Sequence, residues 1–290
     1  MYSKNVMDNL IRSSWIRAMF EEGTRLKKIH GSENVFDFTI GNPDPDPPEN
    51  LKKVLKNLVI EDASGIHRYM SNAGFYDVRE RIASKISQET NLDVTPKHIV
   101  MTCGAAGGLN VTLKTILNPG EEVIVFSPYF VEYLFYIGNH GGIGIPVPTR
   151  QDTFEPDIEA LFNAINEKTR AIIINSPNNP TGIIYKKQTL KNISDIIESK
   201  QKEFNTNITV ISDEPYGNIV FDNIKVPSIL NIFKNSVVIN SFSKSHSLPG
   251  ERIGYIAVNP LIKECQKFLD GMIFCNRTLG FVNAPALFQK

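Results

Sequence analysis

The sequence predicts an α/β protein built on a mostly parallel, mixed sheet that is sandwiched by helices. Short apolar runs alternate along the chain with longer amphipathic segments, and this alternation is typical of α/β construction. Most of the apolar runs show no polar alternation, as expected of strands whose two faces are both covered by helices. The 290 residues, 41% of them hydrophobic, suffice for one large domain, or for one domain and part of another.

The N-terminal part predicts two helices separated by an extended segment. Helical spacing is expected over residues 11–28 and again over residues 51–58. Between them, DFTIGNPDPDPPENL carries closely spaced prolines, which neither a helix interior nor a central strand tolerates.

The remainder of the chain predicts six strands and three further helices. The expected strands are residues 98–102, 122–126, 170–175, 208–213, 236–241 and 254–258. The expected helices are residues 105–117, 154–165 and 186–202, the first of which is ended by Asn118-Pro119-Gly120.

Charge and composition favour a small or local partner. Lys and Arg together number 31, as do Asp and Glu, so no global field attracts nucleic acid or an anionic membrane. No apolar run approaches the ~20 residues that span a bilayer. Asp8, Arg12 and Arg17 stand where a signal peptide would need an apolar stretch. We therefore expect a cytoplasmic location.

The three cysteines indicate neither a disulfide framework nor a metal site. Cys103, Cys265 and Cys275 form no close pair and no metal-like cluster with the five histidines. We expect buried thiols and no bound metal.

A run of very small residues follows the first of these six strands. Gly104, Ala105 and Ala106 have almost no side chain and would open the next helix. The free N–H groups of a helix start attract anions, although a tight strand-to-helix turn would also explain the glycine. In open α/β sheets the ligand crevice lies beyond the carboxyl ends of the strands, where this turn is expected.

Amides and carboxylates are expected at the same edge. Asn178 and Asn179 follow the strand at 170–175, and Asp213 and Glu214 come at the end of the strand at 208–213. A carboxylate at a buried edge needs a cation or a hydrogen-bond donor, or it takes up a proton.

Hydroxyl groups and two cations follow the strand at 236–241. Ser241, Ser243 and Lys244 stand at its end, and Arg252 comes just before the next strand. Lysine is rarely buried, so one among small residues at a strand end is unusual, although a surface lysine is the simpler interpretation. The planar guanidinium of arginine matches phosphate.

Together these groups suit pyridoxal 5′-phosphate. Lys244 would form the Schiff base, and Asp213 would hold a proton on the pyridine nitrogen. The phosphate would be bound by Gly104, Ala105, Ala106, Ser241, Ser243 and Arg252.

The motifs also resemble those of a known family, the class I and II pyridoxal-phosphate-dependent aminotransferases of the aspartate aminotransferase family, fold type I. PNNPTG is similar to the N-P-T-G signature of the family, SDEPY to its D-x-x-Y, and SFSKSHSLPGERIGY to its S-x-x-K followed by G-x-R-x-G. Order and spacing match as well, and the resemblance extends from about residue 36 to 289. It implies the large domain of a fold type I transferase.

The resemblance implies a role for each matching residue. Lys244 is implied to be the aldimine lysine and general base, Asp213 the partner of the pyridinium nitrogen, and Asn179 with Tyr216 the partners of the phenolic oxygen. The implied reaction is transamination between an L-amino acid and a 2-oxo acid, and the family leads us to expect an aspartate-like substrate.

Further positions match the family less directly. Phe130 corresponds to the aromatic ring that stacks on the pyridine, although a core aromatic is the alternative. Tyr69, followed by Gly74, resembles the tyrosine that reaches the phosphate of a neighbouring subunit, which implies a homodimer. Gly41 resembles a segment near the substrate carboxylate, where Asn179 is also implied.

The domain organisation expected from the resemblance is incomplete. Residues 1–45 correspond to part of the small domain of relatives, and residues 46–290 to the cofactor-binding large domain. Relatives continue for about 100 more residues, which include the arginine that clamps the substrate carboxylate. We therefore expect the C-terminal small domain to be absent, and exposed apolar surface where it would dock.

Two other interpretations remain open. The chain could be a non-catalytic or impaired cofactor-binding module, or it could catalyse another fold type I reaction such as β-elimination or decarboxylation. A dinucleotide site is not indicated, because the G-x-G at Gly142 and Gly144 lacks a third glycine and a following helix.

Overall fold

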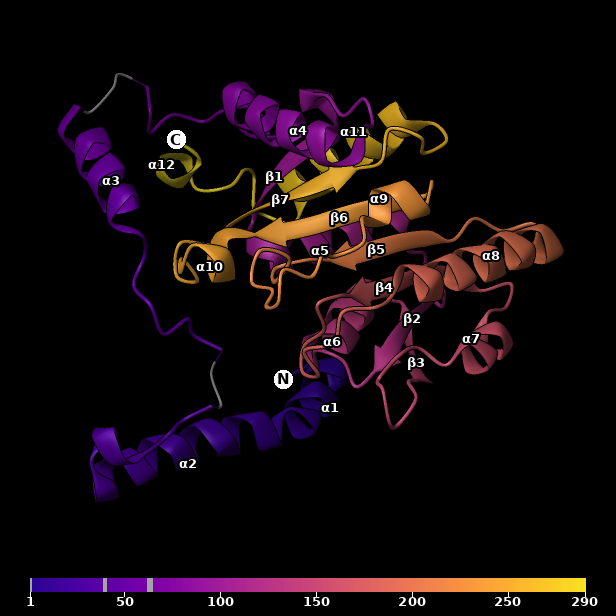
Figure 1. The fold of residues 1–290 in the computed structure, drawn as a ribbon, viewed down its shortest axis with the longest axis horizontal. Coiled ribbons are helices and arrows are strands. Elements are labelled where there is room, and N and C mark those ends of the chain that lie inside the picture. The colour runs from indigo at the N-terminus through magenta and orange to yellow at the C-terminus, as the bar shows by residue number, and fades with distance from the viewer. Residues whose placement is uncertain (1, 39–40, 62–64) are drawn as a thin grey trace. The chain divides into compact units, whose positions relative to one another are not determined.

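One seven-stranded sheet positions the site in the computed structural model, which describes residues 2–38, 41–61 and 65–290 (Figure 1). The strand order is β1-β7-β6-β5-β4-β2-β3. Only β7 runs antiparallel to its neighbours; the other pairs are parallel. The predicted mixed, mostly parallel sheet is thus confirmed. The strands are β1 (Ile99–Cys103), β2 (Glu122–Ser127), β3 (Ile143–Pro148), β4 (Thr169–Asn175), β5 (Thr209–Asp213), β6 (Ser236–Ser241) and β7 (Ile253–Val258).

Helices cover both faces of the sheet and enclose two cores (Figure 1). Ile99 and Met101 of β1 join one core, whereas Val100 between them joins the other. Burial on both faces explains why these strands are continuous apolar runs. One core includes side chains of α4 (Tyr76–Thr90), α7 (Ile158–Ala164), α8 (Lys187–Phe204) and α9 (Ile229–Ile232). The other includes side chains of α5 (Gly104–Ile116), α6 (Glu132–Asn139) and α11 (Cys265–Thr278).

The chain divides into two compact units, residues 1–46 and 47–290. The first holds α1 (Lys4–Arg12) and α2 (Ser14–His30), so the single helix predicted over 11–28 is instead two helices that meet at Ser13. The second begins with α3 (Glu49–Glu61) and also contains the short helices α10 (Phe242–Ser245) and α12 (Ala286–Gln289). Within the described ranges, no helix has the length and apolar character needed to cross a bilayer.

Several elements differ from the sequence prediction. The strand β3 was not predicted, because Pro146 and Pro148 argue against a strand; it lies at the edge of the sheet, where proline is tolerated. The helix predicted from 154 begins only at Ile158. Phe154 has a positive φ of 55°, and Asp157 caps the helix by accepting from the Ala160 amide. The helices α4, α6 and α11 were not predicted.

The cysteines are free thiols, but they are less buried than expected. Cys275 is buried, whereas Cys103 and Cys265 are only partly so. Each of the two partly buried thiols lies near a backbone carbonyl oxygen. Among the described residues, no group of three or more His, Cys, Asp or Glu side chains is placed to hold a metal ion.

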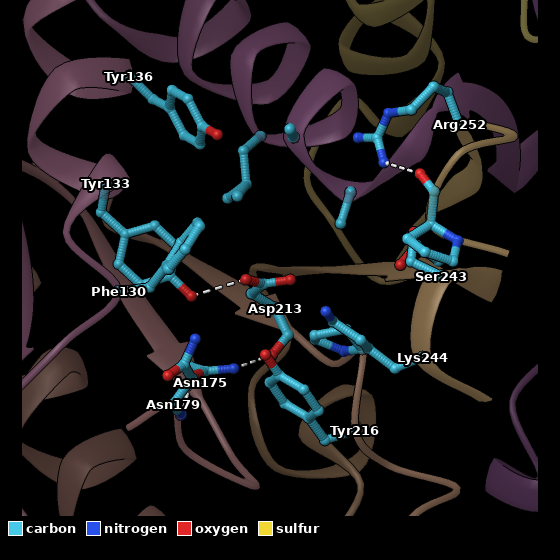
Figure 2. A pocket seen from close by; sticks show the side chains of 16 residues that line it. Phe130, Tyr133, Tyr136, Asn175, Asn179, Asp213, Tyr216, Ser243, Lys244 and Arg252 are labelled. Atoms are coloured by element: carbon cyan, nitrogen blue, oxygen red, sulfur yellow. Dashed lines mark hydrogen bonds between the residues drawn. The ribbon is translucent and has the colours of Figure 1, made fainter. Parts of the chain in front are cut away.

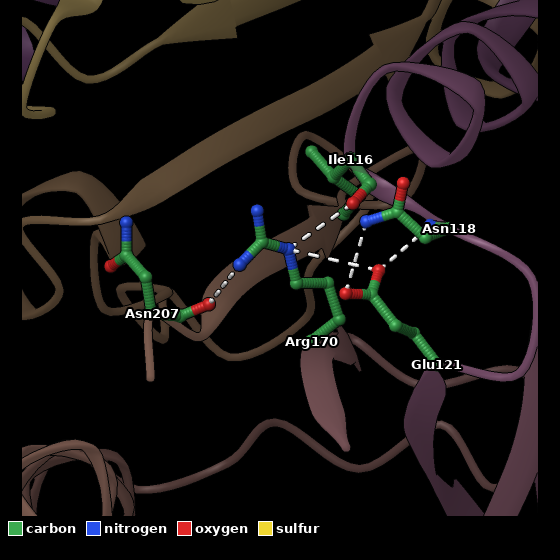
Figure 3. A network of polar contacts seen from close by, with 5 residues as sticks. All are labelled: Ile116, Asn118, Glu121, Arg170 and Asn207. Atoms are coloured by element: carbon green, nitrogen blue, oxygen red, sulfur yellow. Dashed lines mark hydrogen bonds and ion pairs between the residues drawn. The ribbon is translucent and has the colours of Figure 1, made fainter. Parts of the chain in front are cut away.

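Arg170 makes polar contacts at the amino-terminal ends of the central strands, opposite the cavity (Figure 3). Its Nε donates to the Ile116 carbonyl oxygen at 3.1 Å, and its Nη1 to the Asn207 carbonyl oxygen at 3.4 Å. Glu121, 3.9 Å from the same Nε, accepts from the Asn118 amide at 2.7 Å. The segments that enter β2, β4 and β5 are therefore tied together, which holds the opposite strand ends in fixed relation.

Candidate active site

A cavity of about 220 Å³ lies at the carboxyl ends of the central strands (Figure 2). Polar side chains reach it from β4, β5 and β6 and from the segments that follow them. Its lining residues are Ala105, Ala106, Leu109, Phe130, Tyr133, Tyr136, Asn175, Asn179, Asp213, Pro215, Tyr216, Ser241, Ser243, Lys244, Pro249 and Arg252.

Most of the residues singled out in the sequence meet in this cavity. Ten of them line it: Ala105, Ala106, Phe130, Asn179, Asp213, Tyr216, Ser241, Ser243, Lys244 and Arg252. Gly104 lies directly behind the Arg252 guanidinium. Neither Gly104 nor Tyr69 lines it, and Tyr69 is 90% exposed. Gly41 belongs to the separate N-terminal unit, where it is exposed.

Asp213 is a buried carboxylate of which only one oxygen accepts a hydrogen bond from a described residue. It ends β5, where strand register pairs it with Asn175 of β4. The Tyr133 hydroxyl donates to Asp213 Oδ2 at 2.6 Å. The other oxygen, Oδ1, is buried and has no hydrogen-bond partner in the described part of the chain. Burial raises the pKa of Asp213 to about 6, and the tyrosine hydrogen bond opposes that rise.

The asparagines hold the turn after β4 against β5. Asn175 Nδ2 donates to the Asp213 carbonyl oxygen at 2.8 Å, and the Asn179 amide donates to Asn175 Oδ1 at 2.7 Å. Burial raises the pKa of the Tyr216 hydroxyl, and a hydrogen bond with the Asn179 side chain opposes that rise. Asn179 and Tyr216 therefore offer adjacent polar groups to the same part of the cavity.

Lys244 brings an amine of lowered basicity into the cavity. The residue lies on α10, directly after β6, and Figure 2 shows its amine pointing into the cavity. Burial lowers its pKa, and the nearby charge of Arg252 lowers it further. A lower pKa raises the fraction of neutral amine, which is the nucleophilic and basic form.

The start of α5 and Arg252 form the cationic end of the cavity. A Cβ atom at Gly104 would lie 2.6 Å from Arg252 Nη2, so a larger residue there would displace the guanidinium from this position. Arg252 is further held by donation from Nη1 to the Pro249 carbonyl oxygen at 2.9 Å. At Gly254, a Cβ would lie 2.5 Å from the Asn240 carbonyl oxygen and 2.9 Å from the Gly104 carbonyl carbon. These glycines let the start of α5, the Arg252 side chain and β7 approach one another closely. The free N–H groups at the start of α5 favour an anion at this end of the cavity.

Sequence reasoning missed the contribution of α6. Tyr133 and Tyr136 both line the cavity, and Phe130 packs edge-on against the Tyr133 ring, with centroids 5.5 Å apart. Asn175 was also missed, because it was assigned only to the end of a strand. YFVEYLFY shows three tyrosines, Tyr129, Tyr133 and Tyr136, but nothing local in the sequence indicates which of them reach the cavity.

Two titratable residues beside the site do not line it. The Ser212 hydroxyl donates to Glu214 Oε1 at 2.7 Å, and burial raises the pKa of Glu214 to about 7. His246 packs edge-on against Phe242, and its Nδ1 lies 2.8 Å from the Ser245 hydroxyl. Of the adjacent acids Asp213 and Glu214, only the first reaches the cavity.

Comparison with known proteins gives one consistent result. The family model "Aminotransferase class I and II" matches residues 33–286. The "Probable aspartate aminotransferase" of Methanocaldococcus jannaschii is 33% identical over 91% of this chain and 65% of its own length. The "Aspartate aminotransferase" of Pyrococcus horikoshii is 34% identical over 89% of this chain and 63% of its own. The chain thus spans less than two thirds of these curated relatives.

Solved structures agree with that result. An amino transferase from Eubacterium rectale superposes with a TM-score of 0.94 at 38% identity, covering 100% of this chain and 73% of its own. An aspartate aminotransferase from Thermotoga maritima gives 0.80 at 30% identity, covering 99% and 73%.

Proposed function

The chain belongs to the aminotransferase class I and II family, and on that premise we propose that it transfers an amino group between an L-amino acid and a 2-oxo acid with pyridoxal 5′-phosphate. The observation that carries this proposal is the meeting of an amine, a buried carboxylate and a guanidinium in one cavity. The three side chains reach the cavity from different elements: Asp213 from the end of β5, Lys244 from α10, and Arg252 from the turn before β7.

The residues present fit this cofactor. Asp213 Oδ1 is a buried acceptor that lacks a donor, and a protonated pyridine nitrogen is such a donor. The cationic end at Gly104 and Arg252 suits a phosphate group. The lowered pKa of Lys244 suits an amine that must react with an aldehyde.

The protein groups would then act in four ways. When bound, the cofactor supplies an electron sink for the charge left at the substrate Cα after its proton leaves. The Asp213 carboxylate keeps a proton on the ring nitrogen, which strengthens that sink. Lys244 would hold the aldehyde carbon of the cofactor through its amine, and as a free amine it would take the proton from the substrate Cα as general base. Asn179 and Tyr216 orient the phenolic oxygen, and Phe130 backs the ring.

Substrate and assembly complete the proposal. L-Aspartate is the first amino acid to test, because relatives of this chain are named aspartate aminotransferases. We further propose a cytoplasmic homodimer, in which the exposed Tyr69 serves the phosphate end of a second copy. Gly41 would border the substrate. Residues 1–45 would form part of a small domain, and residues 46–290 the cofactor-binding domain.

Reductive labelling tests the proposal directly. The purified chain is incubated with pyridoxal phosphate, reduced with borohydride and mapped by peptide mass spectrometry. We expect a single major label on Lys244, while the exposed Lys187 of α8 serves as the internal control for random surface labelling. Comparable labelling of both lysines would overturn the cofactor site.

Turnover is tested separately. L-Aspartate should abolish the absorbance band of the bound cofactor, and 2-oxoglutarate should restore it. Specific labelling of Lys244 without such a cycle for aspartate or any other common L-amino acid would reject amino transfer and favour a module that only binds the cofactor.

A further inference from the structure

Tyr136 is a polar residue of the cavity to which the sequence motifs assign no role. It lies on α6, and Figure 2 shows its hydroxyl pointing into the cavity. That hydroxyl makes no hydrogen bond with any residue that the structure describes. A phenol that lines a cavity in this way is a donor available to a ligand.

The electrostatic surroundings keep this phenol neutral. Burial raises the pKa of Tyr136 to about 12, and the charges of Glu132 and Asp213 act in the same direction. The charge of Arg252 acts in the opposite direction. The hydroxyl therefore retains its proton at neutral pH and can donate it in a hydrogen bond.

Among the described residues that line the cavity, the other side-chain donors at the cationic end do not come from α6. The first three residues of α5 are Gly104, Ala105 and Ala106, which offer only backbone N–H groups. The charged and hydroxyl donors, Ser241, Ser243 and Arg252, all come from β6, α10 and the turn before β7. Tyr136 comes from α6, so its hydroxyl would add a side-chain donor on the side of the cavity that the other donors do not cover.

The position of α6 against α5 is itself fixed. His140, the residue after α6, places its Nε2 3.0 Å from Oδ1 of Asn110 on α5. This contact joins the end of α6 to the middle of α5, one turn beyond Tyr136. The hydroxyl is thus held in a defined place relative to the α5 start.

We propose that the Tyr136 hydroxyl is a binding residue of the cationic end and donates a hydrogen bond to the phosphate group of the ligand. The identity of that ligand rests on the proposed function. The binding of phosphate by Tyr136 does not.

The test compares two ligands that differ only in the phosphate. Dissociation constants for pyridoxal phosphate and for pyridoxal are measured by cofactor absorbance with the wild-type chain and with Tyr136→Phe. We expect pyridoxal phosphate to bind about tenfold or more weakly to the variant, as for a lost hydrogen bond to a charged group. The affinity for pyridoxal should stay unchanged. Equal losses for both ligands, or no loss for either, would overturn the proposal.

Tyr185→Phe is the matched control. Tyr185 is another buried tyrosine, packed edge-on against Phe126 in the core on the other face of the sheet. Its substitution removes the same hydroxyl without touching the cavity, so the ratio of the two dissociation constants should equal that of the wild type. A change of the ratio in this control as large as in Tyr136→Phe would assign the effect to packing.

Inorganic phosphate separates this proposal from the proposed function. Added phosphate should raise the unfolding temperature of the cofactor-free wild-type chain and of Tyr185→Phe, and should raise that of Tyr136→Phe much less. If phosphate discriminates in this way but pyridoxal phosphate does not bind, the proposed function fails and the role of Tyr136 stands. If pyridoxal phosphate labels Lys244 but Tyr136→Phe responds like the wild type to both phosphates, the role of Tyr136 fails alone.

Discussion

Removal of the Tyr133 hydroxyl should raise the pKa of Asp213. In the structure this hydroxyl donates to Asp213 Oδ2 at 2.6 Å, and Tyr133 is only 2% exposed. The bond stabilises the ionised carboxylate against the burial that raises its pKa to about 6. Because Oδ1 already lacks a partner among the described residues, Tyr133→Phe would leave neither carboxylate oxygen with a described donor.

The size of the shift follows from the strength of the bond. A hydrogen bond to a charged group contributes ~1.5–3 kcal/mol, and each pKa unit corresponds to ~1.4 kcal/mol. The pKa of Asp213 should therefore rise by ~1–2 units in Tyr133→Phe. At neutral pH the carboxylate of the cofactor-free chain would then be at least half protonated, which would weaken its interaction with a protonated ring nitrogen.

Carbon-13 NMR of labelled aspartate carboxyl groups measures this shift in the cofactor-free chain. Asp213→Asn identifies the resonance, and Tyr185→Phe controls for loss of a buried tyrosine hydroxyl elsewhere. With cofactor and substrates, the acid limb of the pH–rate profile should move to higher pH. A folded Tyr133→Phe chain in which the Asp213 resonance keeps its wild-type midpoint would refute the reasoning.

Two further predictions concern stability. The pKa of Glu214 rises from an ordinary 4.5 to about 7 through burial, so its ionisation disfavours the folded state increasingly as pH rises from 4.5 to 7. Because Glu214 keeps some solvent contact, Glu214→Gln should be ~1–3 kcal/mol more stable than the wild type at pH 8 and equal to it at pH 4. Urea unfolding would contradict this if both chains showed the same pH dependence. Gly254→Ala places a Cβ 2.5 Å from a backbone oxygen, so it should lose ~1–3 kcal/mol of stability and weaken cofactor binding. Gly250→Ala, where a Cβ meets nothing within 4 Å, should change neither stability nor cofactor binding. Equal urea midpoints for the two variants would contradict the predicted clash at Gly254.

Buried strands of the sheet were predictable because their physical signature is local. The strand predicted at 236–241 has the same bounds as β6, and the strand predicted at 208–213 begins one residue before β5. Strands covered on both faces consist of consecutive apolar residues, which the sequence shows directly. Side chains attached to the ends of such strands, among them Asp213 and Lys244, could therefore be assigned to one edge before the fold was known.

The unpredicted elements fall into two groups. Edge strand β3 contains two prolines, and only its place in the sheet, with a single neighbour, makes them acceptable. By contrast, α4 was open to prediction, since Ile82, Ala83 and Ile86 recur at helical spacing and pack against the core.

The orientation of α6 had no local signal, and this is why Tyr133 and Tyr136 were missed. The helix is the connection between β2 and β3, so its residues do not stand at the end of a strand that borders the cavity. Tyr133 and Ile137, four residues apart, are both buried in the core and define its inner face. That face is selected by packing, because Leu134 and Phe135 are as apolar as the residues that are buried. Once the packing places Tyr133 against Asp213, helical geometry puts Tyr136 one turn along on the same side, and both hydroxyls reach the cavity. A tyrosine in an otherwise apolar helix beside a strand-end carboxylate is therefore the feature to seek in a sequence. Its ring packs in the core while its hydroxyl reaches the site.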